Sequence, residues 1–457
     1  MEIKKIQCNK RFKKTAEIPV GKKQYEIDDF TKDYMSIISN SIVRRLQDKT
    51  QVFPLDKNDF IRTRLTHSLE VSSIAQQLGI MLKKHNIIIE HAPMILQCAG
   101  LLHDLGNPPF GHFGEVVIRD WFKNNLPKIK YKGKPISEVL SDREKADLLN
   151  FEGNAQTFRL LTKIYKNQNG NNLNLTFSII STLIKYPVSS LEINSADSNI
   201  KKHKLGYFYA EDKQMKLISE EVGTISNSEY VRHPLTYLLE AADDIAYATS
   251  DLEDAYKKKL FTIDQLLVFL KQFTGDRYYS ECVDLLEKLQ KENRNSEFST
   301  FHDWIINIKW RLMYSAMFRF SSKYEEIMKG TYEKDLFYKT FQGDTLKMLK
   351  QASYEFAFNS KNVLKLELTG KTIIDDLLDK FVNAVIHYDC NDVKQNKTDK
   401  KYISLISKDF INDYLLYKQD LSESYNLYLR ILMVLDYISS MTDSYIKDLY
   451  KELNGID

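Results

Sequence analysis

Residues 92–106, APMILQCAGLLHDLG, decide the fold of this chain. Pro93 suits the first turn of a helix, where its missing N–H is not needed, and Gly106 suits the end of one. The apolar residues of this stretch recur with the helical period and share one face: Met94, Ile95, Cys98, Leu101, Leu102 and Leu105. The stretch therefore predicts an apolar-faced helix whose last turn carries His103 and Asp104.

The same helical period extends over most of the 457 residues, and only 16 glycines and 9 prolines interrupt it. A second long helix is predicted to begin at Pro234, in HPLTYLLEAADDIAYATSDLEDAYKK at 233–258. Asp243, Tyr247 and Asp251 stand at i, i+4 and i+8 in it, so they stack on one face. The predicted fold class is mainly α.

The composition excludes several classes of protein. Hydrophobic residues make up 43% and charged residues 28%, with a net charge of +3, which is the balance of a globular protein. The four cysteines form no CxxC pair, which argues against a zinc ribbon or a disulfide framework. No stretch approaches the roughly 18 apolar residues of a membrane span, and the N-terminus lacks the apolar run of a signal peptide. We expect a cytoplasmic protein with no membrane partner.

Two histidines and two aspartates form the main candidate site. His103 and Asp104 fall in the last turn of the first helix, where free carbonyls and the helix dipole favour a cation. His67, in RTRLTHSLEV, and Asp243 come from other predicted helices, and an unpartnered carboxylate is costly to bury in so apolar a helix. Together they suit one divalent cation with open coordination positions. A hydrogen-bonded core histidine and a simple ion pair are the structural alternatives for His67 and Asp243.

Four motifs follow one another along the chain: RTRLTHSLEV, LLHDLGNPPFGHFGE, FEGNAQ and EAADDIAYATSDLED. Together they resemble the HD-domain superfamily, and specifically the bacterial deoxyguanosinetriphosphate triphosphohydrolases and their dNTPase relatives. The resemblance runs from about residue 44 to residue 254 and implies an HD-domain helical core with an additional C-terminal helical region. We expect an N-terminal segment at 1–43 and a metal-dependent phosphohydrolase core at 44–257, with an irregular Asn-, Lys- and Ser-rich insertion at about 166–233. Residues 258–457 then form a C-terminal helical region that contributes to the substrate pocket and to oligomer contacts.

The resemblance makes His67, His103, Asp104 and Asp243 the ligands of one metal ion. Asp243 is preferred to its neighbour in sequence because it alone shares a face with Tyr247 and Asp251. Two nitrogens and two oxygens suit Mg²⁺, Mn²⁺ or Fe²⁺ better than structural zinc. The family implies Mg²⁺ or Mn²⁺ as the activator.

His112 and Glu115, at i and i+3 in GHFGE, are implied as an auxiliary acid/base pair. Glu115 orients the imidazole, and His112 handles the proton of the water or of the leaving oxygen. The alternative is a hydrogen bond that only fastens the loop onto the following helix.

The resemblance also implies residues that hold a nucleotide, and two of them have plain structural alternatives. Arg64 could be a surface ion-pair partner, and Tyr247 could be a core aromatic. The implied set is Lys185, Tyr186 and Lys204 at the phosphates, Arg64 and Asn154 along the phosphate and metal region, and Gln51, Tyr247 and Asp251 around the deoxyribose.

The implied activity is hydrolysis of a dNTP, with dGTP favoured, by attack of water on the α-phosphate to give deoxynucleoside and tripolyphosphate. One alternative is another HD phosphohydrolase, a nucleotidase or a phosphodiesterase, which shares the ligand set but not the flanking motifs. A second is a nucleotide-sensing or single-stranded nucleic acid binding protein. The family resemblance also implies a homo-oligomer, commonly a hexamer. No motif identifies the base pocket, which the family builds partly from C-terminal segments.

Overall fold

The structure is a computed structural model that describes residues 1–13, 27–53, 61–163, 173–273, 275, 277–292, 297–359, 361–390, 393, 395–419 and 422–456. These residues are mainly helical, which confirms the predicted fold class. The only strands among them form two short antiparallel pairs, β1 (Lys130–Tyr131) with β2 (Lys134–Pro135) and β3 (Ile225–Ser226) with β4 (Glu229–Tyr230). None of the described helices is long and apolar enough to cross a membrane.

The first half of the chain supplies the helices around the candidate site. They are α1 (Ile3–Ile6), α2 (Asp29–Ser39), α3 (Ser41–Arg44), α4 (Arg64–Met81), α5 (Ala92–Leu102), α6 (Gly111–Asn125), α7 (Ile136–Val139), α8 (Asp142–Leu149), α9 (Gly153–Thr162), α10 (Phe177–Thr182), α11 (Asp212–Val222) and α12 (Pro234–Lys257).

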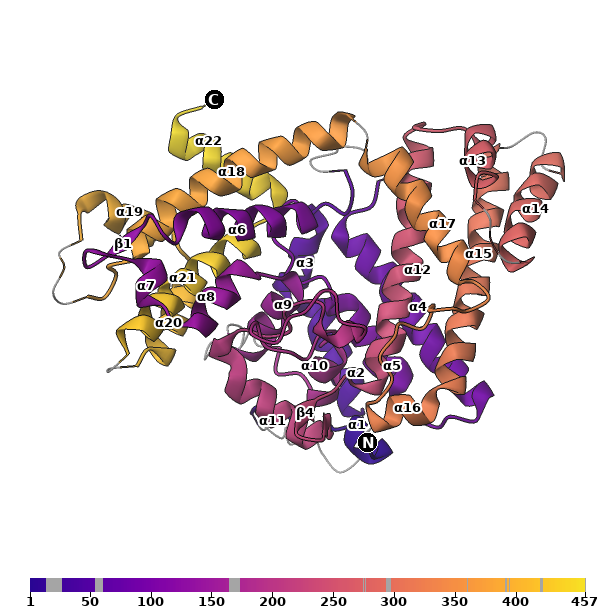
Figure 1. Cartoon of the computed structure of the whole chain (residues 1–457), viewed down its shortest axis with the longest axis horizontal. Helices are drawn as coiled ribbons and strands as arrows, with labels where there is room; N and C mark the ends of the chain where they lie inside the picture. The colour runs from indigo at the N-terminus through magenta and orange to yellow at the C-terminus, as the bar shows by residue number, and fades with distance from the viewer. Residues whose placement is uncertain are drawn as a thin grey trace.

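The second half packs around this group, with α15 and α17 against α12 and the long α18 across α6, α21 and α22 (Figure 1). Its helices are α13 (Ile263–Leu270), α14 (Arg277–Glu292), α15 (Glu297–Ser322), α16 (Tyr324–Lys329), α17 (Gly343–Ser353), a π-helical turn (Tyr354–Phe358), α18 (Lys361–Val385), α19 (Lys397–Leu405), α20 (Lys408–Tyr417), α21 (Glu423–Ser440) and α22 (Asp443–Asn454).

Helices α4, α5 and α12 form the centre of the fold, and α12 packs against both of the others. Gly100 of α5 lies directly on the backbone of α4: a Cβ at this position would stand 2.5 Å from the Cα of Ser72. Ser72 also donates to the Gln97 carbonyl at 2.8 Å. The close approach of these two helices brings His67, near the start of α4, next to the end of α5.

The predicted helix over 92–106 ends earlier than its apolar pattern indicates. Helix α5 stops at Leu102, His103 is its C-cap, and residues 103–106 form a turn. The turn is held by α9, because the Gly106 amide donates to Thr157 Oγ1 at 2.9 Å and a Cβ on Gly106 would lie 2.2 Å from the Thr157 nitrogen. This tertiary contact, which the periodicity does not record, ends the helix.

Part of the segment predicted as an insertion belongs to the central packing. Within 166–233, α10 packs against α5 and α12, and its Phe177, Ile179 and Ile180 are buried. Irregular backbone follows it up to α11. The Asn-rich stretch over 164–172, expected as a loop, lies outside the described residues.

Candidate metal centre and active site

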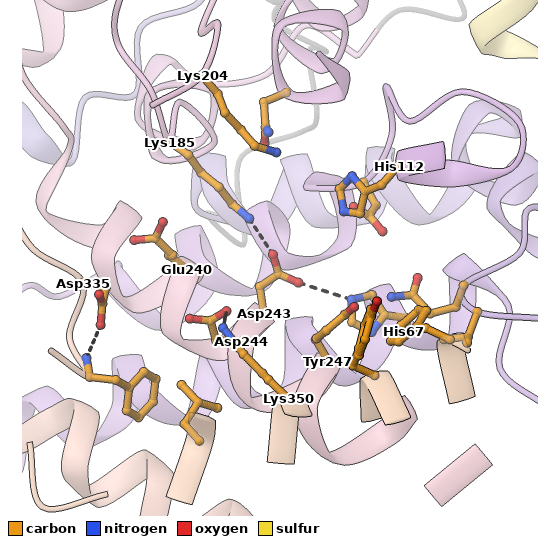
Figure 2. A pocket seen from close by; sticks show the side chains of 18 of the residues that line it. His67, His112, Lys185, Lys204, Glu240, Asp243, Asp244, Tyr247, Asp335 and Lys350 are labelled. Carbon is orange, nitrogen blue, oxygen red and sulfur yellow. Dashed lines mark hydrogen bonds and ion pairs between the residues drawn. The ribbon is translucent and has the colours of Figure 1, made fainter. Parts of the chain in front are cut away.

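Three helices bring His67, His103 and Asp243 together. The Nε2 atoms of both histidines lie 3.3 Å from Asp243 Oδ1, and one ligand atom of each residue lies within 4.8 Å of the others. Both histidines are buried, and their ring centroids are 5.4 Å apart. Figure 2 shows Asp243 between the His67 ring and the Lys185 ammonium. The structure thus brings together three of the four residues predicted as metal ligands.

The hydrogen bonding of His103 fits a cation at this point. Its Nδ1 donates to the Gly100 carbonyl at 2.8 Å, so in the neutral ring the lone pair lies on Nε2. Nε2 is buried, faces Asp243 Oδ1 and has no hydrogen-bond partner among the described residues. Burial opposes the charged form of His103, yet Asp104 and Asp243 raise its pKa, so the surroundings favour positive charge. Nitrogen and oxygen donors that converge in this way suit a divalent cation such as Mg²⁺ or Mn²⁺.

Asp104, the fourth predicted ligand, borders the cluster. Its Oδ1 lies 3.5 Å from His103 Nε2 and accepts from the Asn107 amide group at 2.6 Å. Its Oδ2 accepts from the Arg64 guanidinium, so Arg64 is a buried partner of the cluster and not a surface ion pair. Burial opposes ionisation, but Arg64 and His103 hold the pKa of Asp104 well below its usual range. The carboxylate is therefore charged.

Lys185 pairs with Asp243 at 2.5 Å between Nζ and Oδ2. Its backbone carbonyl accepts from Arg232 Nε at 2.6 Å, and Arg232 forms a two-pronged ion pair with Glu240 at 2.8 and 2.9 Å. This pair fixes the position of Lys185 on the side of α12. Sequence reasoning missed Arg232 and Glu240, because nothing in the local pattern relates them to Lys185.

His112 and Glu115 form the predicted pair at the start of α6. His112 Nδ1 lies 3.0 Å from Glu115 Oε2, and Glu115 Oε1 accepts from the Gly153 amide at 2.8 Å. The His112 side chain is 65% exposed and that of Glu115 only 2%. The negative charge of Glu115 raises the pKa of His112. A buried carboxylate therefore holds one ring nitrogen of a side chain that is itself exposed and lines the pocket above the cluster.

A pocket of about 1260 Å³ opens above the cluster. Seven of the eight residues implied in nucleotide binding line it: Gln51, Arg64, Asn154, Lys185, Tyr186, Lys204 and Tyr247. The eighth, Asp251, does not line it and is 1% exposed; burial raises its pKa far above the usual range. Both of its side-chain oxygens lack a hydrogen-bond partner among the described residues.

Part of the pocket wall comes from the C-terminal region, including Asp335, Lys350, Phe358 and Glu367, where the sequence carries no recognisable motif. Phe358 stacks on Tyr247 with ring centroids 5.9 Å apart and an interplanar angle of 15°. Lys350 pairs with Asp244 at 2.6 Å, so the two adjacent acids of α12 have different partners. Tyr247 is therefore not a core aromatic residue. It lines the pocket and stacks on Phe358.

Comparison with known proteins agrees with this geometry. Residues 64–170, which hold His67 and the His103–Asp104 pair, match the model of the HD domain, so this part of the chain is similar to HD domains.

Relatives extend the match to nearly the full chain. A deoxyguanosinetriphosphate triphosphohydrolase-like protein of Listeria monocytogenes is 42% identical over 442 residues, covering 93% of this chain and 94% of the relative. A like-named protein of Synechocystis is 32% identical over the whole of both chains. The deoxyguanosinetriphosphate triphosphohydrolase of Yersinia pseudotuberculosis is 32% identical over 98% of each. The chain belongs to the deoxyguanosinetriphosphate triphosphohydrolase family.

Proposed function

We propose that this protein is a metal-dependent dNTP triphosphohydrolase that prefers dGTP and releases deoxynucleoside and tripolyphosphate. The observation that carries the proposal is the convergence of His67, His103 and Asp243 beneath a pocket lined by cationic side chains. The names of the relatives support a deoxyguanosine triphosphate as substrate. The metal ligands are His67, His103, Asp104 and Asp243, and the ion is Mg²⁺ or Mn²⁺.

Cleavage at the α-phosphorus forms a bond to the water oxygen and breaks the bond to the 5′ oxygen of the sugar. A bound divalent cation supplies a more acidic water and neutralises phosphoryl charge. His112 then moves the proton that the reaction requires, either from the water or to the leaving 5′ oxygen. Glu115 keeps the ring of His112 oriented through Nδ1 and stabilises its charged form.

The phosphates need cations beyond the metal ion. Lys185, Lys204 and Arg64, which all line the pocket, supply them. Lys204 is held at 2.9 Å by Glu152, a buried carboxylate near Glu115. Binding a triphosphate would draw Lys185 away from Asp243. Lys185 would then contact the phosphates, and Asp243 would contact the cation.

The deoxyribose would lie against Tyr247, which leaves no room for a 2′-hydroxyl, and Gln51 would bond its 3′-hydroxyl. Gln51 offers a buried Oε1 that has no hydrogen-bond partner among the described residues. A site built around a hydroxyl rejects the analogue that lacks it, because buried polar groups are then left unpaired. Asp251 would bond the 3′-hydroxyl as well only if the side chains that cover it move.

The test is a product analysis of the purified protein. Each dNTP and GTP is incubated with Mg²⁺ or Mn²⁺, with chelator as the blank, and the products are separated by ion exchange. We expect tripolyphosphate in equimolar amount with deoxyguanosine, and slower turnover of the other nucleotides. Asp104→Ala is the inactive variant, and Asp142→Asn, at a side chain that is 89% exposed, is its matched control. Orthophosphate or pyrophosphate as the first product refutes the proposed reaction, and faster turnover of another dNTP refutes the preference.

We also propose that the protein is a homo-oligomer, and a hexamer by its kinship. Light scattering of the protein as it elutes from a size-exclusion column measures the mass of the assembly directly. A monomer at micromolar concentration would contradict this proposal without affecting the reaction.

A further inference from the structure

The turn between the metal cluster and His112 has a strained backbone. Phe110 has a φ of +61°, in the left-handed region that bulky side chains rarely adopt. Such a conformation persists only where the surroundings hold it. Asn107, in the same turn, donates to Asp104 through its side chain. The position of this turn therefore decides where both Asp104 and His112 lie.

Lys49, 58 residues before Asn107 in the sequence, holds the turn through its side chain. Its Nζ donates to the Asn107 carbonyl at 2.6 Å and to the Ser439 carbonyl, near the end of α21, also at 2.6 Å. Its own carbonyl accepts from the Arg64 amide at 2.8 Å. One residue thus joins the turn, the first residue of α4 and the C-terminal region.

Asp443, the first residue of α22, also holds the turn. Its Oδ1 accepts from the Phe110 amide at 3.0 Å, and its Oδ2 accepts from the Thr50 amide at 2.9 Å. The strained residue and the neighbour of Lys49 are therefore tied to the same carboxylate. A lysine amine and a carboxylate thus hold the turn through hydrogen bonds to its main chain.

Burying the ionisable side chains of Lys49 and Asp443 costs free energy. Lys49 and Asp443 are each 2% exposed, and burial lowers the pKa of Lys49 to about 7, with Asp443 opposing. A methionine would fill much of the volume of Lys49 without desolvating a charge, so packing alone does not account for the ammonium. Their hydrogen bonds are directed at the main chain of the turn and of its neighbours.

We propose that Lys49 and Asp443 are positioning residues that fix the turn over 103–111, so that Asp104 and His112 keep the geometry that the cation and the nucleotide require. The part of this inference that concerns turnover rests on the proposed function. The part that concerns the turn and the cation does not. The C-terminal junction of α21 and α22 is thereby a component of the active site, although neither helix lines the pocket.

The experiment compares Lys49→Met and Asp443→Ala with the unaltered protein in three measurements. They are hydrogen exchange of the peptide that spans the turn, Mn²⁺ affinity by calorimetry without nucleotide, and kcat and KM for dGTP. We expect faster exchange of the turn, an affinity for Mn²⁺ that falls about 10- to 100-fold, and a fall in kcat larger than the change in KM. Asp443→Asn, which keeps an acceptor oxygen, should restore part of each effect and serves if the other variants do not fold.

Arg430→Met is the matched control, because Arg430 is equally buried in α21 and donates to the Tyr388 carbonyl, away from the turn. It should lower the melting temperature and leave the turn and the Mn²⁺ affinity unchanged. Unaltered exchange and affinity in Lys49→Met and Asp443→Ala, or equal changes in Arg430→Met, overturn the inference. If dGTP is not hydrolysed but exchange and affinity change as expected, the proposed function fails and the positioning role holds.

Discussion

Replacing Gly100 by alanine tests whether the two histidines must be held together by the packing of α4 on α5. The added Cβ would stand 2.5 Å from the Cα and 2.7 Å from the nitrogen of Ser72. Carbon atoms in contact normally lie about 3.5–4.0 Å apart. Since the obstacle is backbone, the end of α5 must move away from α4 by about 1 Å to reach normal contact.

A movement of this size matters more for the metal than for stability. Overpacking costs about 1–3 kcal/mol, and the higher helix propensity of alanine offsets about 1 kcal/mol of this. Metal–ligand distances, in contrast, tolerate only about 0.2 Å. With His103 displaced from His67, we expect Mn²⁺ affinity to fall about 10- to 100-fold and turnover to fall about 100-fold.

The assay pairs this variant with Gly79→Ala at the far end of the same helix contact. There a Cβ would lie 2.8 Å from the Cα of Pro93, but Gly79 is 12 residues, or about 18 Å, along α4 from His67. Calorimetry with Mn²⁺ and thermal unfolding are measured for both. Similar losses of stability with a loss of Mn²⁺ affinity only in Gly100→Ala would support the reasoning. Wild-type Mn²⁺ affinity in a destabilised Gly100→Ala would refute it.

Three further changes probe the site and the charges around it. Asp243→Asn should abolish Mn²⁺ binding and lower the melting temperature, because Lys185, whose side chain is only 11% exposed, loses its counter-ion; retained binding would remove Asp243 from the ligand set. His112→Ala should lower kcat about 100-fold or more with Mn²⁺ affinity unchanged, since its exposed ring carries a proton and not the cation; loss of Mn²⁺ would make it a ligand. Asp147 is fully buried, and burial raises its pKa from 3.8 to about 6, so its contribution to stability is full below about pH 4 and is lost as the pH rises through 6. The free energy of unfolding relative to Asp147→Asn should therefore fall by about 3 kcal/mol from about pH 4 to about pH 7, and a difference independent of pH would contradict this.

The fold was predictable because helical periodicity is a local property. The apolar spacing around Pro93 and Pro234 predicted α5 and α12, and α12 begins at Pro234 as expected. The end of α5 was predicted four residues late, because the contact of Gly106 with α9 terminates it. The sequence thus fixes which segments are helical more reliably than where each one stops.

In the candidate site, too, the local sequence predicted some features and tertiary contacts decided others. The motifs identified the candidate residues, and the family resemblance that they carry is confirmed by relatives over nearly the full chain. Only the tertiary structure decided that His103 presents Nε2 to Asp243, that Lys185 pairs with Asp243, and that C-terminal residues such as Lys350 and Phe358 line the pocket. The hydrogen bond from Lys49 to the Ser439 carbonyl joins positions 390 apart. A single sequence records the local pattern that makes each helix, but contacts between distant segments depend on how those helices pack, and no local spacing encodes them.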